Sequence, residues 1–533
     1  MKKVSSDQDN RHVLSSSASL LSHQTASPMQ QQPTRTAYRI LIFNTLAFTV
    51  CFAGWVLNGV LVAFLIDNGI VNWTLVQAGW LLGIPVLTGS VMRLPMGLLT
   101  DKLGGRWVFS GLMLFCAIPL FLLSKTTDYT LFLVLSFLFG LLGASFAVGV
   151  GFTSLWFPPQ WQGRALGIFG MGNTGSAITT MVAPSLLIRL TNNGADPDGW
   201  KTLPMIYAGA LVVMAVLFML FTENKPSASS GKTLQVMLKP LKSLRVWRFG
   251  LYYFLVFGCF VTFSQWLLSY FLNVYAITLV TAGLLTACFS LPAGLFRAVG
   301  GWLSDKFGAR AVMYWVLGSS LVLSALLLIP RMEIYSPGAG LMAREAGTVS
   351  SVEKDHIIVD NKTYPIIARP PQKKDEGTQH LIFPTKESWQ EAIVHPGDPI
   401  RKKQMLAQGV TRIYFQANIW VFAVLIMLLG MSWGIGTAAV FKHIPEYFPD
   451  EVGIVGGMVG MIGGLGGFVG PILFGYLLNV SGLWTSSWFF VCLLSAVCLI
   501  WMHRVITSMM SKNAPHLKNK FEVPHKTMVS TEK

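Results

Sequence analysis

The chain has 533 residues, of which 53% are hydrophobic and only 12% are charged, and its formal net charge is +16. Soluble proteins carry about 25% charged residues, so this composition excludes an ordinary soluble domain and indicates a polytopic membrane protein. The basic residues lie mostly in loops and tails. Membrane topology or an anionic lipid surface therefore accounts for the positive charge better than nucleic acid does.

The chain begins with residues 1–37, which are rich in Ser, Gln, Thr and Asn and predict a disordered tail without a cleavable signal peptide. Twelve apolar runs follow, each near the roughly 20 residues that a helix needs to cross a bilayer. We therefore predict an all-α membrane protein with twelve transmembrane helices. The runs lie at about 40–66, 76–100, 106–124, 130–156, 163–190, 203–222, 248–274, 281–303, 311–330, 416–446, 452–478 and 484–502.

These runs predict two six-helix bundles, over 38–222 and 248–508, with a basic linker at 223–247 and a second tail at 509–533. One set of short connections is rich in lysine and arginine, whereas the opposite set is nearly free of them. The basic set, the linker and both tails are therefore expected in the cytoplasm. The basic residues of these short connections, outside the linker, include Lys102, Arg106, Arg164, Lys306, Arg310 and Lys442.

A polar insert, 331–415, separates the ninth and tenth predicted helices on the outer face. Its segment HIIVDNKTYPIIA predicts a small hairpin with an Asp-Asn-Lys turn. Long translocated loops escape the charge rule, so its basic residues are compatible with this orientation. The sequence leaves its role open between a passive cap or contact surface and part of a site.

No metal or cofactor site is expected. The six cysteines all fall within apolar runs and lack metal-ligand spacing. They are interpreted as small core residues rather than as disulfides or a zinc site.

An internal repeat relates the two halves. The segments SVMRLPMGLLTDKLGGR and GLFRAVGGWLSDKFGAR each place an arginine eight residues before an aspartate, and they start 204 residues apart. The members of a second pair, GASFAVGVGFTSLWFP and GIGTAAVFKHIPEYFP, start 291 residues apart. The excess of this offset over the offset of 204 residues is about the size of the insert. Two such halves are the architecture of a transporter that rocks around a midplane site.

Each copy ends in the pattern G-x3-D-x2-G-x-R, at Gly97 and again at Gly301. This pattern resembles the loop signature of the major facilitator superfamily, and its glycines allow a tight turn between helices. The resemblance implies that its charged residues form pairs that latch one conformation; the alternative is that the basic ones merely hold topology. These residues are Asp101, Arg106, Asp305 and Arg310.

The repeated arginines, Arg93 and Arg297, lie about 12 Å from the ends of their predicted helices, near the membrane midplane. Burying an arginine there costs at least about 2.5 kcal/mol. Snorkelling toward the cytoplasm is the alternative for one arginine, but it explains a symmetry-related pair less well. The central parts of the predicted spans carry no Asp, Glu, Lys or His. The missing counterion is then an anionic substrate, and the planar guanidinium fork suits a small oxyanion.

Spans five and eleven are rich in glycine, which lets helices approach closely and leaves room for a small flat substrate. Asn173 is the one amide among these glycines and can donate to an oxyanion. The glycines that we assign to the substrate helices are Gly167, Gly170, Gly172, Gly175, Gly460, Gly463, Gly464, Gly466 and Gly467.

Three segments, GMGNTGSAITTMVAP, GASFAVGVGFTSLWFPPQWQGRALG and FKHIPEYFP, resemble the nitrate/nitrite porters of the major facilitator superfamily. The resemblance covers the twelve predicted helices but neither the N-terminal tail nor the insert. It implies that the anion lies between the two arginines and is flanked by aromatic residues. The matching positions are Phe146, Tyr253, Phe257 and, more weakly, Phe441.

The resemblance implies a carrier of nitrate and nitrite that works by alternating access in the cell membrane. An enzyme is not expected, because the His, Asp, Glu or Ser–His pair that an intramembrane enzyme needs is missing at membrane depth. The carrier is expected to be a monomer. Proton-coupled carriers usually have a protonatable group within a span, and the central parts of these predicted spans carry no Asp, Glu, Lys or His. Nitrate/nitrite exchange is therefore favoured over proton symport. The sequence is also compatible with a facilitator for a different small anion and with a non-transporting sensor. Membrane lipid is an expected partner, and nucleic acid is not.

Overall fold

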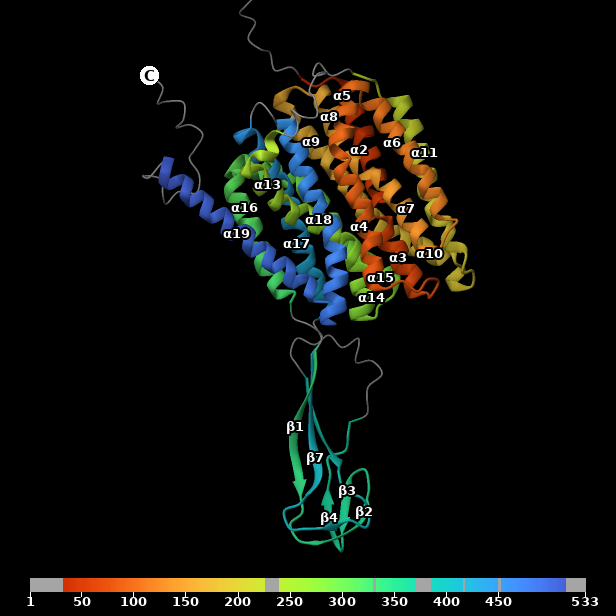
Figure 1. The fold of residues 1–533 in the computed structure, drawn as a ribbon, viewed down its shortest axis with the longest axis vertical. Helices are drawn as coiled ribbons and strands as arrows, with labels where there is room; N and C mark the ends of the chain where they lie inside the picture. Colours follow the sequence, from red (N-terminus) through yellow and green to blue (C-terminus); the bar gives the residue numbers. More distant parts are fainter. Residues whose placement is uncertain are drawn as a thin grey trace, which may run out of the picture.

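The computed structural model describes residues 32–225, 239–328, 332–370, 385–415, 418–448 and 452–513. Figure 1 shows two parts, a bundle of long helices and a small β-domain that extends from one end of the bundle. We call that end the insert face and the opposite end the loop face. Most of the two predicted tails lies outside the described residues.

Six helical segments form the N-terminal bundle, and most of them are interrupted near their middle. Their bounds are α2 (Arg35–Trp55) with α3 (Leu57–Asp67), α4 (Leu75–Val91) with α5 (Arg93–Leu103), α6 (Gly105–Leu123), α7 (Tyr129–Phe139) with η1 (Gly140–Ala144) and α8 (Ser145–Trp156), α9 (Pro159–Gly170) with η2 (Met171–Thr174) and α10 (Gly175–Leu190), and α11 (Thr202–Phe221). Two short 3-10 turns, η3 (Asn192–Gly194) and η4 (Gly199–Lys201), precede α11.

The C-terminal bundle has longer uninterrupted helices. After the turn η5 (Lys239–Lys242), its elements are α13 (Leu244–Tyr253) with the π-helical turn η6 (Phe254–Gly258) and α14 (Cys259–Tyr275), α15 (Leu279–Phe307), α16 (Ala309–Leu326), α17 (Ile419–Tyr447), α18 (Val452–Ser481) and α19 (Ser486–Asn513). Helix α19 therefore continues past residue 508, where the sequence placed the end of this bundle.

Ten helical segments among the described residues are long and apolar enough to cross a membrane, and the bent pair α4–α5 makes eleven. The remaining predicted span corresponds to α9–η2–α10, whose glycine, serine and threonine residues make it less apolar. The twelve-helix prediction is confirmed for the membrane part of this multi-pass protein. Its all-α character does not extend to the insert.

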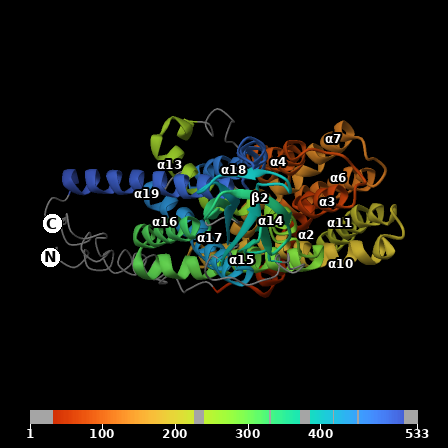
Figure 2. The same ribbon diagram turned by 90° about the horizontal axis from the view of Figure 1, so that it is seen from below.

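The two bundles lie side by side, as Figure 2 shows when the molecule is seen from below. Helix α4 packs against α18, and α10 packs against α15. On the insert side these contacts are close, because a Cβ added at Gly83 would lie 2.6 Å from the backbone oxygen of Phe468. A Cβ at Gly283 of α15 would likewise collide with the backbone of Thr180. The interface is therefore closed on the insert side.

The repeat seen in the sequence recurs in helix caps and turns. Thr74 caps the start of α4, and Thr278, at the equivalent position, caps the start of α15. Gly104 and Gly308 cap the ends of α5 and α15 with φ values of 87° and 86°, a backbone conformation that favours glycine. The second and eighth spans thus start and end in the same way.

The described residues of the insert form seven strands rather than the single predicted hairpin. They are β1 (Met332–Met342), β2 (Gly347–Val352), β3 (His356–Val359), β4 (Lys362–Pro365), β5 (Thr385–Ala392), β6 (Pro399–Ile400) and β7 (Met405–Phe415). The sheets have the orders β1-β7-β5 and β4-β3-β2-β6. The predicted hairpin is β3–β4, whose turn is Asp360–Asn361. The other strands escaped prediction because β1 pairs with β7 across the whole insert.

All six cysteines are free, as the sequence indicated. Cys51, Cys116, Cys259 and Cys498 are buried, but Cys288 is exposed on α15. The interpretation of every cysteine as a core residue is therefore wrong for Cys288, whose helix presents one face to the outside of the bundle.

Candidate anion site between the bundles

Arg93 stands at a break in the second span. Helices α4 and α5 meet at an angle of 42°, and Met92 caps both of them. The break makes Arg93 the first residue of α5, where its side chain is only 2% exposed and crosses to the other bundle. Its Nη1 donates to the backbone oxygen of Gly460 in α18 at 2.5 Å, whereas its Nε has no partner among the described residues.

Arg297 lies inside the uninterrupted helix α15 and is 6% exposed. It also meets the opposite bundle, because a Cβ added at Gly170 of α9 would lie 2.8 Å from its Nε. Its Nη1 has no partner within the described ranges. Each arginine is thus buried against a glycine of the opposite bundle, with N–H donors left over.

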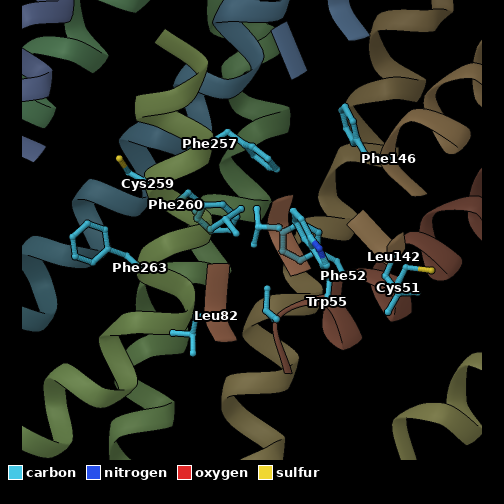
Figure 3. Packing of buried hydrophobic residues seen from close by; sticks show 14 of the residues in the cluster. Cys51, Phe52, Trp55, Leu82, Leu142, Phe146, Phe257, Cys259, Phe260 and Phe263 are labelled. Atoms are coloured by element: carbon cyan, nitrogen blue, oxygen red, sulfur yellow. The ribbon is translucent and has the colours of Figure 1, made fainter. Parts of the chain in front are cut away.

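The ring of Phe146 lies beside both guanidinium groups. Its centroid is 5.4 Å from Cζ of Arg93 and 5.0 Å from Cζ of Arg297. Phe257 approaches Arg93 from the opposite bundle at 5.2 Å, and Figure 3 shows these two phenylalanines on helices of opposite bundles. Such cation–π contacts place the charges without neutralising them. In the part of the chain that the structure describes, neither arginine forms an ion pair with a carboxylate.

Tyr253 and Phe257 form the wall of the site on the seventh span. Their rings stack at 4.9 Å with an angle of 10°, and Tyr253 meets Phe441 edge-on at 5.0 Å. Tyr253 is completely buried, and its hydroxyl has no partner among the described residues. A buried hydroxyl without a partner costs free energy, so this group is available to a ligand.

Two more buried polar groups lie in the same layer. Asn173, in η2, is 2% exposed and its Oδ1 lacks a partner within the described chain. Ser90, one turn before Arg93, also has an unpartnered Oγ there, and a Cβ at Gly464 would collide with it. Ser90 could not be recognised from the sequence, because a serine near the end of an apolar helix carries no distinctive signal.

The nine candidate glycines fall into groups according to the atoms that lie near their Cβ positions. Gly170, Gly460 and Gly464 adjoin the arginines, and a side chain at Gly463 would collide with Tyr253. The others pack helices together, except Gly167, which has open space around its Cβ position. The glycines with a packing role are Gly172, Gly175, Gly466 and Gly467.

Helix irregularities gather at the level of the arginines. The break at Met92 precedes Arg93, η1 ends just before Phe146, η2 contains Asn173 and the π-helical turn η6 contains Phe257. Such turns expose backbone groups and are frequent at functional sites. No local residue signal marks them, so sequence reasoning did not place them.

The charged residues of the two loops lie away from this site, at the loop face. Asp305 forms an ion pair with Lys442 of α17 at 2.5 Å, and Arg310 donates to the hydroxyl of Tyr447 at 2.8 Å. Arg106 donates to the backbone oxygen of Met219. Asp101 lies near the end of α5. In the second copy, these contacts join the loop to α17.

Only one group of potential metal ligands occurs among the described residues, and it lies in the β-domain. Glu353, Asp355 and His356 place one ligand atom each within 4.8 Å of one another. His356 donates to Asp355 at 2.8 Å, and this hydrogen bond holds the pKa of Asp355 below its ordinary value. The group is open to solvent and far along the chain from the arginines. It has no part in the site between the bundles.

Known proteins resemble this chain over most of its length. The family model of the Major Facilitator Superfamily matches residues 44–343 and 405–528, and it leaves out most of the β-domain. A probable nitrate/nitrite antiporter of Thermus thermophilus, NarK1, is 37% identical over 507 residues, covering 94% of this chain and 98% of that protein. A probable nitrate transporter of Staphylococcus epidermidis, NarT, is 26% identical and covers 87% of this chain and 95% of its own length.

Solved structures show the same fold. A bacterial homologue of the human lysosomal transporter Spinster, in an inward-facing and occupied conformation, superimposes with a TM-score of 0.58. The match covers 89% of this chain and 97% of that one, at 12% sequence identity. The chain therefore belongs to the major facilitator superfamily and, within it, to the family of NarK-type nitrate/nitrite porters.

Proposed function

We propose that this protein transports nitrate and nitrite across the cell membrane by alternating access, with one anion held between Arg93 and Arg297. The observation that carries the proposal is the pair of buried guanidinium groups that contact one phenylalanine ring from opposite bundles. The names of the Thermus and Staphylococcus relatives support the choice of anion.

The anion acts as the missing counterion. Two like charges in a low-dielectric interior repel each other and are costly without a partner. A planar oxyanion accepts hydrogen bonds from both guanidinium forks, and Tyr253 and Asn173 flank it with polar groups. The helices approach closely here, since a Cβ at Gly170 would lie only 2.8 Å from Nε of Arg297, and such crowding favours a small anion over a bulky organic one.

Exchange follows from the same charges. An empty site holds two uncompensated cations between the bundles, so reorientation through a closed state is unfavourable. A bound anion removes this repulsion and lets the bundles close on either side. We therefore propose obligatory nitrate/nitrite exchange, with the insert face outside the cell and the loop face in the cytoplasm, where lysine and arginine are concentrated.

Proton-coupled nitrate uptake is the second candidate, and one residue favours it. His443 lies within α17, is 4% exposed and stacks on Phe249 with ring centroids 5.5 Å apart. His443 lies near the loop-face end of α17 rather than in its central part, and an imidazole there is still a protonatable group of the kind that proton-coupled carriers use.

Flux in proteoliposomes separates the two candidates. Labelled nitrate uptake is measured with internal nitrite, and then with an inward proton gradient but without internal anion. Exchange predicts fast uptake in the first condition and background uptake in the second. Undiminished uptake that is driven by the proton gradient alone would establish symport and overturn the exchange proposal.

A further inference from the structure

Gln265 is a buried amide whose side chain has no hydrogen bond to any described residue. It is 1% exposed, and neither Nε2 nor Oε1 has a partner among the described residues. Removing an amide from water without replacing its hydrogen bonds is unfavourable, and most buried polar groups in native proteins are paired. An orphan side chain of this kind therefore calls for a partner that another state of the protein supplies.

Gln265 lies at the contact between the bundles. It is on α14, and a Cβ added at Gly59 of α3 would lie 2.8 Å from its Cα and 2.9 Å from its Cβ. Its neighbour Trp266 instead packs on Phe474 and Trp484 within the C-terminal bundle. Separation of α3 from α14 would thus uncover Gln265 directly.

Its position is on the insert side of the arginines. Gln265 is eight residues beyond Phe257 along the helix, a rise of about 12 Å, and Phe257 contacts Arg93. Between them, Phe260 of one bundle and Phe52 of the other face each other at 6.4 Å, as Figure 3 shows. An anion that moves from the insert face to the arginines passes the level of Gln265 before it reaches these two rings.

We propose that Gln265 is an anion-contacting residue of the vestibule that opens on the insert face. This inference rests on the proposed function. When the bundles part there, water reaches the amide and its Nε2 donates to the incoming oxyanion. A neutral amide holds the anion less tightly than the arginines do, so the anion is released inward. In the closed state the vestibule is gone and the amide is left without partners.

Asn58, the residue next to Gly59, provides a control. It is also a fully buried amide, but its Nδ2 donates to the backbone oxygen of Leu81 at 2.8 Å and to Oγ of Ser136 at 2.9 Å, and only its Oδ1 lacks a partner among the described residues. Asn58 is therefore held within the N-terminal bundle. Replacing a paired amide removes hydrogen bonds, whereas replacing an orphan amide removes none in the closed state.

The test measures nitrate KM separately from each face of oriented proteoliposomes containing the full chain. For Gln265→Leu we expect the insert-face KM to rise about three- to tenfold, with the loop-face KM within twofold of the parent. Gln265→Glu should raise the insert-face KM further, because its charge repels the anion. Thermal stability should hold for Gln265→Leu and fall for Asn58→Leu.

Three results would overturn the inference: an unchanged insert-face KM, an equal loss at both faces, or KM shifts of opposite sign at the two faces. The second would indicate a structural role, and the third a shift in the balance of conformations alone. If the parent protein carries nitrate and Arg297→Lys impairs it while Gln265→Leu does not, only this inference fails. If the parent does not carry nitrate, the proposed function itself fails.

Discussion

The two copies of the repeat share an arginine–aspartate spacing but differ in shape. The first copy, α4–α5, bends by 42° directly before Arg93, whereas the second, α15, is one helix of 29 residues with Arg297 in its interior. Arg93 consequently reaches across to a backbone oxygen of α18, while Arg297 lies against Gly170 of α9.

Sequence symmetry therefore sets the number of buried charges but not their surroundings. Arg93 uses one of its donors to join the two bundles. Arg297 has an unpartnered Nη1 within the described structure, and its guanidinium is the freer of the two to follow an anion. Four sets of variants test whether the two arginines differ in this way.

The largest effect is expected from the arginines themselves. Arg93→Leu or Arg297→Leu should lower the initial rate of nitrate/nitrite exchange at least about 100-fold, because each removes a charge-assisted contact and leaves the other cation unbalanced. Lysine at either position should cost about 10- to 100-fold, since it keeps the charge but loses the fork. Initial rates in proteoliposomes measure this. Normal transport by Arg297→Lys would contradict the bidentate role.

The glycines test whether the two arginines are equally crowded. Gly170→Ala places a methyl group 2.8 Å from Nε of Arg297, and Gly460→Ala places one 3.3 Å from Nη1 of Arg93. We expect the first to lower exchange about tenfold and the second about threefold, because the tighter contact must displace its guanidinium further. Gly167→Ala, which meets no atom within 4 Å, is the matched control. Equal losses of exchange rate for all three variants would show that contact with the arginines does not determine the effect.

Tyr253→Phe tests whether the buried hydroxyl of Tyr253 contributes to anion binding. Removing a hydroxyl that has no partner among the described residues should leave thermal stability unchanged and weaken the apparent nitrate affinity about three- to tenfold. Unfolding curves and uptake at varied nitrate concentration measure the two quantities. Loss of stability without a change in affinity would show that the hydroxyl serves the fold rather than the anion.

The smallest effect is expected at the loop face. Asp305 and Lys442 are both largely exposed, so their ion pair contributes about 0–1 kcal/mol, and Asp305→Asn should change exchange only about twofold. The charge-swapped pair Asp305→Lys with Lys442→Asp should restore the parent rate. If Asp305→Asn is far more damaging than this and the swap fails to rescue it, the aspartate has a role beyond that pair.

The helices could be predicted because length and apolar character are local properties. The starts of α4, α15 and α18 fall within a few residues of the sequence-based bounds. The β-domain could not be predicted in the same way, since β1 pairs with β7, which lies at the opposite end of the insert in the sequence.

Part of the site could be predicted because its signal is also local in the sequence. Arg93 and Arg297 stand out because a charge in an apolar run is expensive wherever it points. Ser90 and Gln265 do not stand out, because a small hydroxyl or a neutral amide is common in helices and becomes unusual only when packing denies it a partner. The break at Met92 likewise has no local residue signal.

We propose that one anion is shared by two arginines from opposite bundles. Calorimetric titration of the purified chain with nitrate, at constant ionic strength, tests this sharing when the parent is compared with Arg93→Leu and Arg297→Leu. We predict one saturable anion site in the parent and none in either variant. Nitrate binding with the parent's affinity by either single variant would contradict the account.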